Sequence, residues 1–157
     1  MALIVQKYGG SSVATAERIK AVAARVGKVY DGGDQVLVVV SAMGDTTDDL
    51  IKLAGQVTSD PHPREMDVLL STGELVASTL LAMAIRNLGY KAISLSGAQA
   101  GIKTDTTYRK ARIVKIETKR ILEELAEGQI VIVAGFRVSP TIWMSPRSAE
   151  AVRIPQR

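Results

Sequence analysis

Near its start the chain reads Ala2-Leu3-Ile4-Val5-Gln6-Lys7-Tyr8-Gly9-Gly10-Ser11-Ser12. The apolar run predicts a strand at residues 2–6, and the glycine pair after it predicts a turn whose positive φ angles let the backbone approach a ligand closely. The helix expected at 15–30 would point its free amide N–H groups at an anion on this turn. Lys7 adds a positive charge at the same place, so this stretch predicts a phosphate site.

This pattern differs from both common glycine-rich phosphate motifs, G-x-x-x-x-G-K-[ST] and G-x-G-x-x-G. A glycine pair after a strand is by itself most often only a turn, and a lysine at a strand end is most often solvated. The phosphate prediction therefore depends on what the rest of the chain adds.

Strands and helices alternate along the rest of the chain. Apolar runs that are typical of buried strands lie at 35–41, 92–95 and 129–134. Helices are expected at 47–57, 64–88 and 118–127, with hairpin strands in 97–109 and another strand at 111–116. This alternation predicts a mainly parallel sheet with helices on both faces, that is, a three-layer α/β/α sandwich.

Composition limits the classes of partner. The 157 residues are 46% hydrophobic and include no cysteine, which excludes disulfides and fits a reducing cytoplasm. Residues 137–157 hold four arginines against one glutamate, so only +1 of the net charge of +4 belongs to residues 1–136. With 4% aromatic residues as well, we expect no nucleic-acid partner. We also expect neither a signal peptide nor a membrane span, because charged or polar residues interrupt the apolar runs.

A second strand ends in a small, hydroxyl-rich loop, Val38-Val39-Val40-Ser41-Ala42-Met43-Gly44-Asp45-Thr46-Thr47-Asp48. Parallel α/β sheets bind ligands at the carboxyl ends of their strands, which makes Ser41 a candidate contact. The alternative is that Ser41 is a turn residue and that Thr46, Thr47 and Asp48 cap the following helix.

Glu74 lies inside the apolar segment Leu69–Ala77, beside Gly73. A carboxylate buried among apolar residues needs a partner or a ligand. The alternative is an exposed position on the helix, and periodicity alone leaves both open.

Taken together, these segments resemble the amino-terminal part of aspartate kinases, in the amino acid kinase family. The resemblance is carried in order by Lys7–Ser12, Ser41–Asp48, Ser71–Glu74, Ser94–Ile102 and Val131–Phe136. It covers residues 1–136, which we therefore expect to form the amino-terminal part of an amino acid kinase domain, an incomplete carbamate kinase-like fold.

The resemblance implies a cytoplasmic enzyme that uses ATP and Mg²⁺ to phosphorylate the side-chain carboxylate of L-aspartate. The product would be 4-phospho-L-aspartate, on the route to lysine, threonine and methionine, and the full-length enzyme would be a homo-oligomer. It implies that Lys7 is catalytic and that Mg²⁺ is bound through the nucleotide phosphates. It assigns ATP binding to Lys7, Tyr8, Gly9, Gly10 and Ser41, and aspartate binding to Asp45, Thr46, Thr47 and Glu74. Thr47 would hydrogen-bond to aspartate, and Glu74 would contact its ammonium group.

The resemblance stops at Arg137. Aspartate kinases continue after A-G-F with Q-G, a variable turn and T-T-L-G-R-G-G-S-D-T-T-A, whereas residues 137–157 hold three prolines, the only tryptophan and no strand or helix period. With synonymous codons, Ala149–Arg157 can be read from the third nucleotide as Arg-Gly-Gly-Ser-Asp-Thr-Thr-Ala. In the same frame Thr141–Ser148 can be read as Asp-Met-Asp-Val-Thr-Thr-Leu-Gly. Our hypothesis is a one-nucleotide frameshift near Arg137, with residues 137–157 a disordered tail outside the family; the alternative is a divergent terminus.

The resemblance implies that the replaced stretch supplies an arginine for the substrate carboxylate and an aspartate that organises the phosphate-binding groups. We therefore expect the chain as written to be inactive, and to leave strand edges that its tail does not pair. The alternatives are a dead fragment that serves at most in binding or assembly, and a kinase for another small acid on the same fold. The Ser41–Asp48 loop and the Ser71–Glu74 segment favour aspartate.

Overall fold

The computed structural model describes residues 1–105, 112–135 and 150–154. Its main sheet has five strands in the order β3-β6-β2-β1-β7. Their bounds are Leu3–Tyr8 for β1, Gln35–Val40 for β2, Ala92–Leu95 for β3, Ile130–Ala134 for β6 and Glu150–Ile154 for β7. Strands β3, β6, β2 and β1 are parallel and β7 is antiparallel to β1, so the prediction of a mainly parallel sheet is confirmed.

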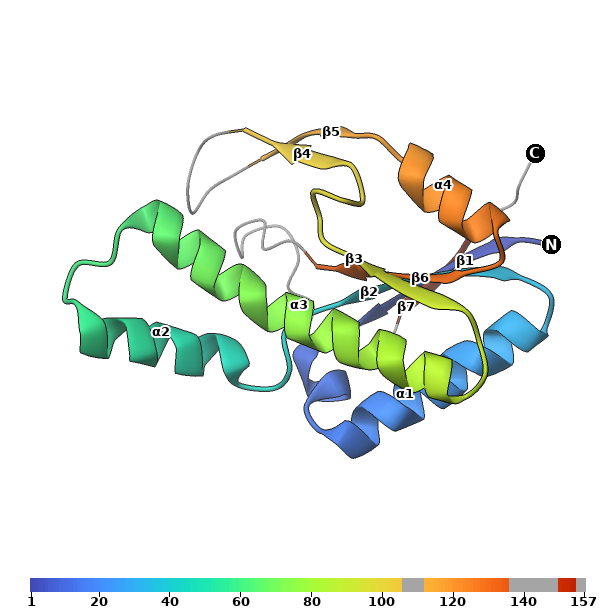
Figure 1. Ribbon diagram of the computed structural model, residues 1–157, viewed down its shortest axis with the longest axis horizontal. Coiled ribbons are helices and arrows are strands. Elements are labelled where there is room, and N and C mark those ends of the chain that lie inside the picture. The colour runs from blue at the N-terminus through green and yellow to red at the C-terminus, as the bar shows by residue number, and fades with distance from the viewer. Residues whose placement is uncertain (106–111, 136–149, 155–157) are drawn as a thin grey trace.

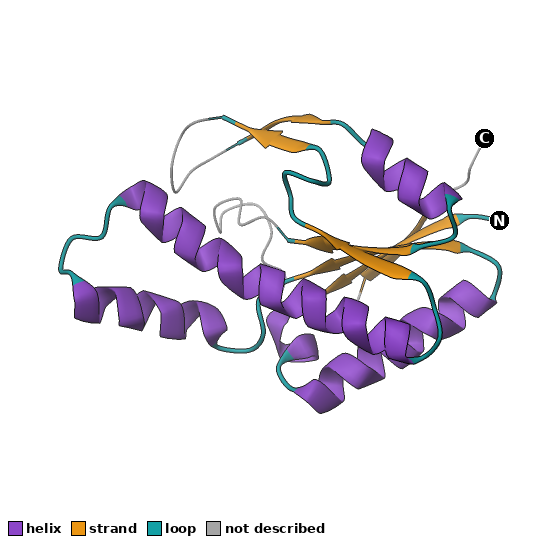
Figure 2. Cartoon of the chain, in the orientation of Figure 1, coloured by secondary structure: helices purple, strands orange, loops and turns teal. Residues whose placement is uncertain are grey.

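Helices cover both faces of this sheet (Figures 1 and 2). Helices α1 (Ala16–Asp31) and α3 (Pro63–Asn87) lie on one face, where their apolar residues form a core with Tyr8, Val36, Val38 and Val40. Helix α4 (Lys119–Ala126) lies on the other face, where Ile121 and Leu125 pack with Val131 and Val133. Because β2 and β6 are covered on both faces, these strands read as unbroken apolar runs.

The remaining elements lie outside the main sheet. A short 3₁₀ turn, η1 (Gly10–Val13), precedes α1, and α2 (Thr46–Val57) precedes α3. Strands β4 (Ile102–Thr104) and β5 (Ile113–Ile116) pair antiparallel as a hairpin. The hairpin strands were expected within 97–109, and this range includes β4 but not β5. Residue 111, the first of the strand expected at 111–116, lies outside the described residues. The described part of that strand contains β5.

Among the helices that the structure describes, α3 alone is long and apolar enough to cross a membrane, with a mean hydropathy of 1.8 over its most apolar window. The sequence predicted no such run. About a third of that window, 33%, is buried inside the protein, and α3 packs against α1 and the sheet. A helix that contributes one face to a protein core meets the same criterion, so this finding is weak support for a membrane span.

The tail differs from its predicted disorder at residues 150–154. These residues form β7, which places Ile154 opposite Leu3 and Glu150 opposite Lys7. The expectation that the tail would leave the edge of β1 unpaired was wrong for this segment. An edge strand presents a row of backbone N–H and C=O groups that any extended segment can complete, whatever its side-chain pattern. The rest of the tail, at 137–149 and 155–157, lies outside the described residues.

Candidate functional site

Two loops meet at the carboxyl ends of β1 and β2. The N–H of Ser41 donates to the carbonyl of Tyr8 at 3.1 Å, and the N–H of Gly44 donates to the carbonyl of Gly10 at 3.0 Å. A Cβ atom added to Gly10 would lie 2.7 Å from the carbonyl oxygen of Ala42. Since real Cβ atoms do not approach an oxygen so closely, glycine at this position is what lets the two loops touch.

The two glycines after β1 have different surroundings. Neither has the positive φ angle that the sequence analysis expected. Gly9 is extended, with φ −75° and ψ 169°, and a Cβ added there would meet no protein atom within 4 Å. The protein's own packing therefore requires glycine at position 10 but leaves open space beside position 9.

This difference predicts opposite results for two alanine substitutions. Gly10→Ala is expected to destabilise the protein by about 1–3 kcal/mol, because the new methyl group collides with the Ala42 carbonyl. Gly9→Ala is expected to change the free energy of unfolding by less than about 0.5 kcal/mol, because the site is open and the backbone conformation is common. Urea unfolding of both variants measures this, and equal destabilisation would contradict the described packing.

Lys7 and Tyr8 lie on opposite faces of the sheet, because neighbouring side chains alternate along a strand. The side chain of Tyr8 is 1% exposed in the core beneath α1 and α3, and its hydroxyl donates to Gln6 Oε1 at 3.2 Å. Lys7 is exposed and shares the face of α4 with Leu3 and Leu37. Tyr8 can therefore contact a ligand on the glycine turn only through its backbone, whereas the Lys7 side chain is accessible from the face of α4.

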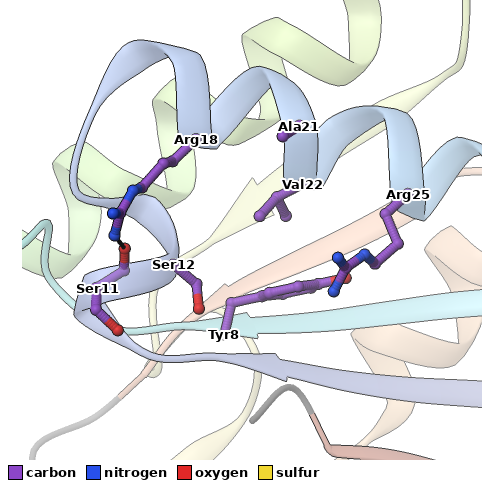
Figure 3. A pocket seen from close by; sticks show the side chains of 7 residues that line it. All are labelled: Tyr8, Ser11, Ser12, Arg18, Ala21, Val22 and Arg25. Atoms are coloured by element: carbon purple, nitrogen blue, oxygen red, sulfur yellow. Dashed lines mark hydrogen bonds between the residues drawn. The ribbon is translucent and has the colours of Figure 1, made fainter.

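The Tyr8 side chain borders a hollow of about 280 Å³ between η1 and α1 (Figure 3). Its other polar lining residues are Ser11, Ser12, Arg18 and Arg25. An Nη of Arg18 donates to the carbonyl of Ser11. Burial raises the pKa of the Tyr8 hydroxyl, and the adjacent Arg25 guanidinium partly offsets that rise. These contacts hold η1 against α1. They lie on the face of the sheet that carries the Tyr8 side chain, opposite to the face of Lys7.

The β2 loop leads directly into α2. Asp45 occupies the N-cap position of α2, yet its side chain makes no capping hydrogen bond. Thr46 and Thr47 form the first turn of the helix, and both side chains are partly buried. Asp45 is exposed, so its carboxylate faces solvent at the carboxyl edge of the sheet.

Helix α3 brings Glu74 to this loop. A Cβ added to Gly73 would lie 3.1 Å from Ala42 Cβ and 3.3 Å from Thr46 Cγ2, so α3 and the loop touch at this glycine. At 100° per residue, Glu74 falls on the same side of α3 as Ala77 and Ser78, which are buried. Glu74 itself is partly buried, which removes the alternative of a fully exposed helix position.

Two further glycines shape the site, and the sequence pattern predicted a role for neither. Gly44, with φ 46°, carries the amide that binds Gly10. Gly135 donates its N–H to the carbonyl of Val40 at 2.8 Å, and a Cβ added to Gly135 would lie 2.8 Å from that oxygen. The sequence signal for both was a glycine soon after a buried strand, Gly44 after β2 and Gly135 after β6. Because β2 and β6 are parallel neighbours, both glycines lie at the carboxyl edge of the sheet.

These observations define a parallel α/β protein whose candidate ligand site lies where β1 and β2 end, bordered by α3. Residues 2–142 match the sequence profile of the amino acid kinase family. The chain therefore belongs to this family.

Among known proteins, the chain is 56% identical over 137 residues to the aspartokinase of Mycolicibacterium smegmatis, covering 87% of this chain and 32% of that protein. The aspartokinase of Geobacillus stearothermophilus is also 56% identical, with 87% and 34% covered. The crystal structure of aspartate kinase from Synechocystis matches with a TM-score of 0.72 and 47% identity, over 87% of this chain and 22% of that one. The chain thus spans about a third of the length of the curated relatives it matches.

Proposed function

We propose that this chain is the amino-terminal part of an aspartate kinase, which transfers the γ-phosphoryl group of ATP to the side-chain carboxylate of L-aspartate. The observation that carries the proposal is the 56% identity to an aspartokinase over 137 residues, 87% of this chain. The family profile, over residues 2–142, spans both loops and Glu74. E. coli aspartokinase III, whose structure holds aspartate and ADP, shares the fold, with a TM-score of 0.70 at 19% identity.

The reaction needs no proton transfer at its start. An aspartate side chain has a pKa near 3.9, so the nucleophile is already a carboxylate at neutral pH. One of its oxygens forms a bond to the γ-phosphorus, the bond from that phosphorus to the bridging β,γ-oxygen breaks, and ADP leaves with the electron pair. The product is an acyl phosphate. The main obstacle is repulsion between two anions, so the protein's task is to position them and neutralise their charge.

The β1 end of the site suits the phosphate groups. Lys7 supplies a positive charge, and the open space beside Gly9 lets a phosphate reach the backbone of Gly9 and Gly10. In this proposal Tyr8 contributes its backbone only, and Ser41 contacts the nucleotide from the end of β2. In the described part of the chain, no three acidic or histidine side chains cluster as a metal site. In this proposal Mg²⁺ enters with ATP, held by the phosphate oxygens, whose charge it neutralises.

The α3 side of the site suits the amino acid. The Glu74 carboxylate would attract the ammonium group of aspartate, and Thr47 would donate a hydrogen bond to it, with Asp45 and Thr46 beside them. Glu74 would at the same time repel both carboxylates of the substrate. Attraction of the ammonium group and repulsion of the carboxylates would together turn the reacting carboxylate away from α3. It would then face Lys7 and the phosphate groups at the end of β1.

Replacing Glu74 with glutamine tests this orientation. Glu74→Gln is expected to raise the KM for aspartate by about 10–100-fold and to leave the KM for ATP within about threefold, because only a charge-assisted contact to the ammonium group is lost. The measurement uses the frame-restored chain, in which the reading frame near codon 137 is corrected. Glu127→Gln, an exposed position after α4, is the matched control. An unchanged KM for aspartate would remove Glu74 from the substrate site without removing the kinase assignment.

As further parts of this proposal, the protein works in the cytoplasm as a homo-oligomer, without a nucleic-acid or membrane partner. Its product enters the route to lysine, threonine and methionine. Residues 1–136 are the amino-terminal part of the family domain, and residues 137–157 replace family sequence through a frameshift.

A further inference from the structure

Helix α3 has a glycine at a point where it touches the loop after β2. Gly73 is buried in the interior of this 25-residue helix, where glycine is destabilising relative to alanine. The space for a side chain is taken, because an added Cβ would lie 3.1 Å from Ala42 Cβ, 3.3 Å from Thr46 Cγ2 and 3.7 Å from Leu50 Cδ1. Gly55 of α2 is the opposite case, since a Cβ added there would meet no described atom within 4 Å. Position 73 therefore excludes a side chain because α3 lies close to the loop and to the start of α2.

Gly73 also marks where α3 leaves the core. No residue of α3 before Gly73 is buried, whereas Ala77, Leu81 and Ile85 are fully buried against α1 and the sheet. The first half of α3 lies beside α2 and extends past the sheet (Figure 1). The contact at Gly73 thus sets how closely α3 approaches the loop at the point where the helix leaves the core.

The two side chains that would bind the ammonium group of aspartate are chain neighbours of this contact. Glu74 follows Gly73 on α3, and Thr47 follows Thr46 at the start of α2. We propose that Gly73 is a positioning residue for the amino acid substrate, because its bare backbone lets α3 approach the loop and so sets the gap between Glu74 and Thr47. This inference rests on the proposed function, in which these two side chains share the ammonium group.

The contact distances give the size of the displacement that a side chain would cause. Carbon atoms pack at about 3.5–4.0 Å, so a methyl group at position 73, 3.1 Å from Ala42 Cβ, would push the two elements apart by about 0.5 Å. The loop is held in place, because the N–H of Gly44 donates to the carbonyl of Gly10 at 3.0 Å and the carbonyl of Ala42 lies against Gly10. Helix α3 is therefore the element that moves, and it carries Glu74 away from the loop. Since a binding group must be held to within about 0.5 Å, this movement is expected to weaken aspartate binding.

Steady-state kinetics of the frame-restored chain test this role. Gly73→Ala is expected to raise the KM for aspartate about 10-fold and to change kcat and the KM for ATP by less than about threefold, because the ammonium contact is the same in the ground state and the transition state. Gly55→Ala, at the helical glycine with open space, is the matched control and is expected to keep wild-type kinetics. An unchanged KM for aspartate in Gly73→Ala, or an equal rise in Gly55→Ala, would overturn the proposal.

A second substitution across the contact separates positioning from stability. Ala42→Gly removes the methyl group nearest to the added Cβ, so adding it to Gly73→Ala is expected to bring the KM for aspartate to within about threefold of that of Ala42→Gly alone. Thermal unfolding followed by circular dichroism reports the stability of each variant. If Gly73→Ala alone fails to fold, the double variant is expected to fold. A double variant that stays unfolded, or that keeps the raised KM for aspartate, would overturn the proposal.

The same assay separates failure of this inference from failure of the proposed function. If the frame-restored chain without further substitution releases no ADP in the presence of aspartate, the kinase assignment is overturned and the role of Gly73 with it. If that chain is active and Gly73→Ala keeps its KM for aspartate, only the role of Gly73 is overturned. The expected result is an active chain whose KM for aspartate rises in Gly73→Ala and recovers when Ala42→Gly is added.

Discussion

Replacing Lys7 with alanine is expected to lower the kcat of aspartate phosphorylation at least about 100-fold while changing the KM for either substrate much less. Negative charge moves onto the bridging oxygen and the equatorial phosphoryl oxygens as the γ-phosphoryl group leaves ADP. A lysine at the end of β1 would stabilise that charge most in the transition state, which is why the loss should appear in kcat. Because Lys7 is exposed, its truncation removes no core packing.

The measurement is steady-state ADP release by the frame-restored chain at saturating ATP and aspartate. Lys20→Ala, at an exposed position of α1, is the matched control and is expected to keep wild-type kinetics. If Lys7→Ala raised only the KM for ATP, Lys7 would bind the ground-state nucleotide and would have no catalytic role.

The layers of the fold could be predicted from the sequence because burial on both faces leaves a simple pattern. The unbroken apolar runs in β2 and β6 indicated interior strands, and the apolar spacing of residues 64–88 predicted α3 to within a residue or two at each end. The site could be placed at the carboxyl edge of the sheet for a related reason. Parallel strands end on the same side, so the loops after β1 and β2 had to be neighbours.

The orientation of Tyr8 could not be predicted because it depends on where β1 ends. A strand that stops at residue 6 leaves both Lys7 and Tyr8 in the turn, where their side chains can point the same way. The structure continues β1 through Tyr8, and alternation then sends Tyr8 into the core and Lys7 to the other face. The two additional residues of β1 thus leave Lys7, and not Tyr8, with a side chain that could reach the proposed phosphate.

The role of Gly10 and the existence of β7 were hidden for another reason, since both depend on distant parts of the chain. Gly10 is required by the carbonyl of Ala42, and no local pattern records that contact. Strand β7 pairs with β1 through the backbone, so the irregular side-chain pattern of the tail gave no sign of it.

The chain as written is expected to form no aspartyl phosphate, whereas the frame-restored chain is expected to form it. Residues 137–157 stand where the family resemblance implies the Arg-Gly-Gly-Ser-Asp segment, with its arginine for the substrate carboxylate and its organising aspartate. Loss of even one such electrostatic contact typically costs about 100–1,000-fold in rate, and the proposed frameshift would remove several together. Sequencing the gene around codon 137 shows whether the frame itself is interrupted.

Trapping the acyl phosphate product is the sharpest test of the proposed aspartate kinase activity. Hydroxylamine converts an acyl phosphate into a hydroxamate, so incubation of the frame-restored chain with ATP, Mg²⁺, hydroxylamine and an amino acid identifies the acceptor. The account predicts aspartyl hydroxamate with L-aspartate, no hydroxamate with L-glutamate, and none from the Lys7→Ala variant or from the chain as written. Hydroxamate formed with another small acid but not with L-aspartate, or formed equally well without Lys7, would contradict it.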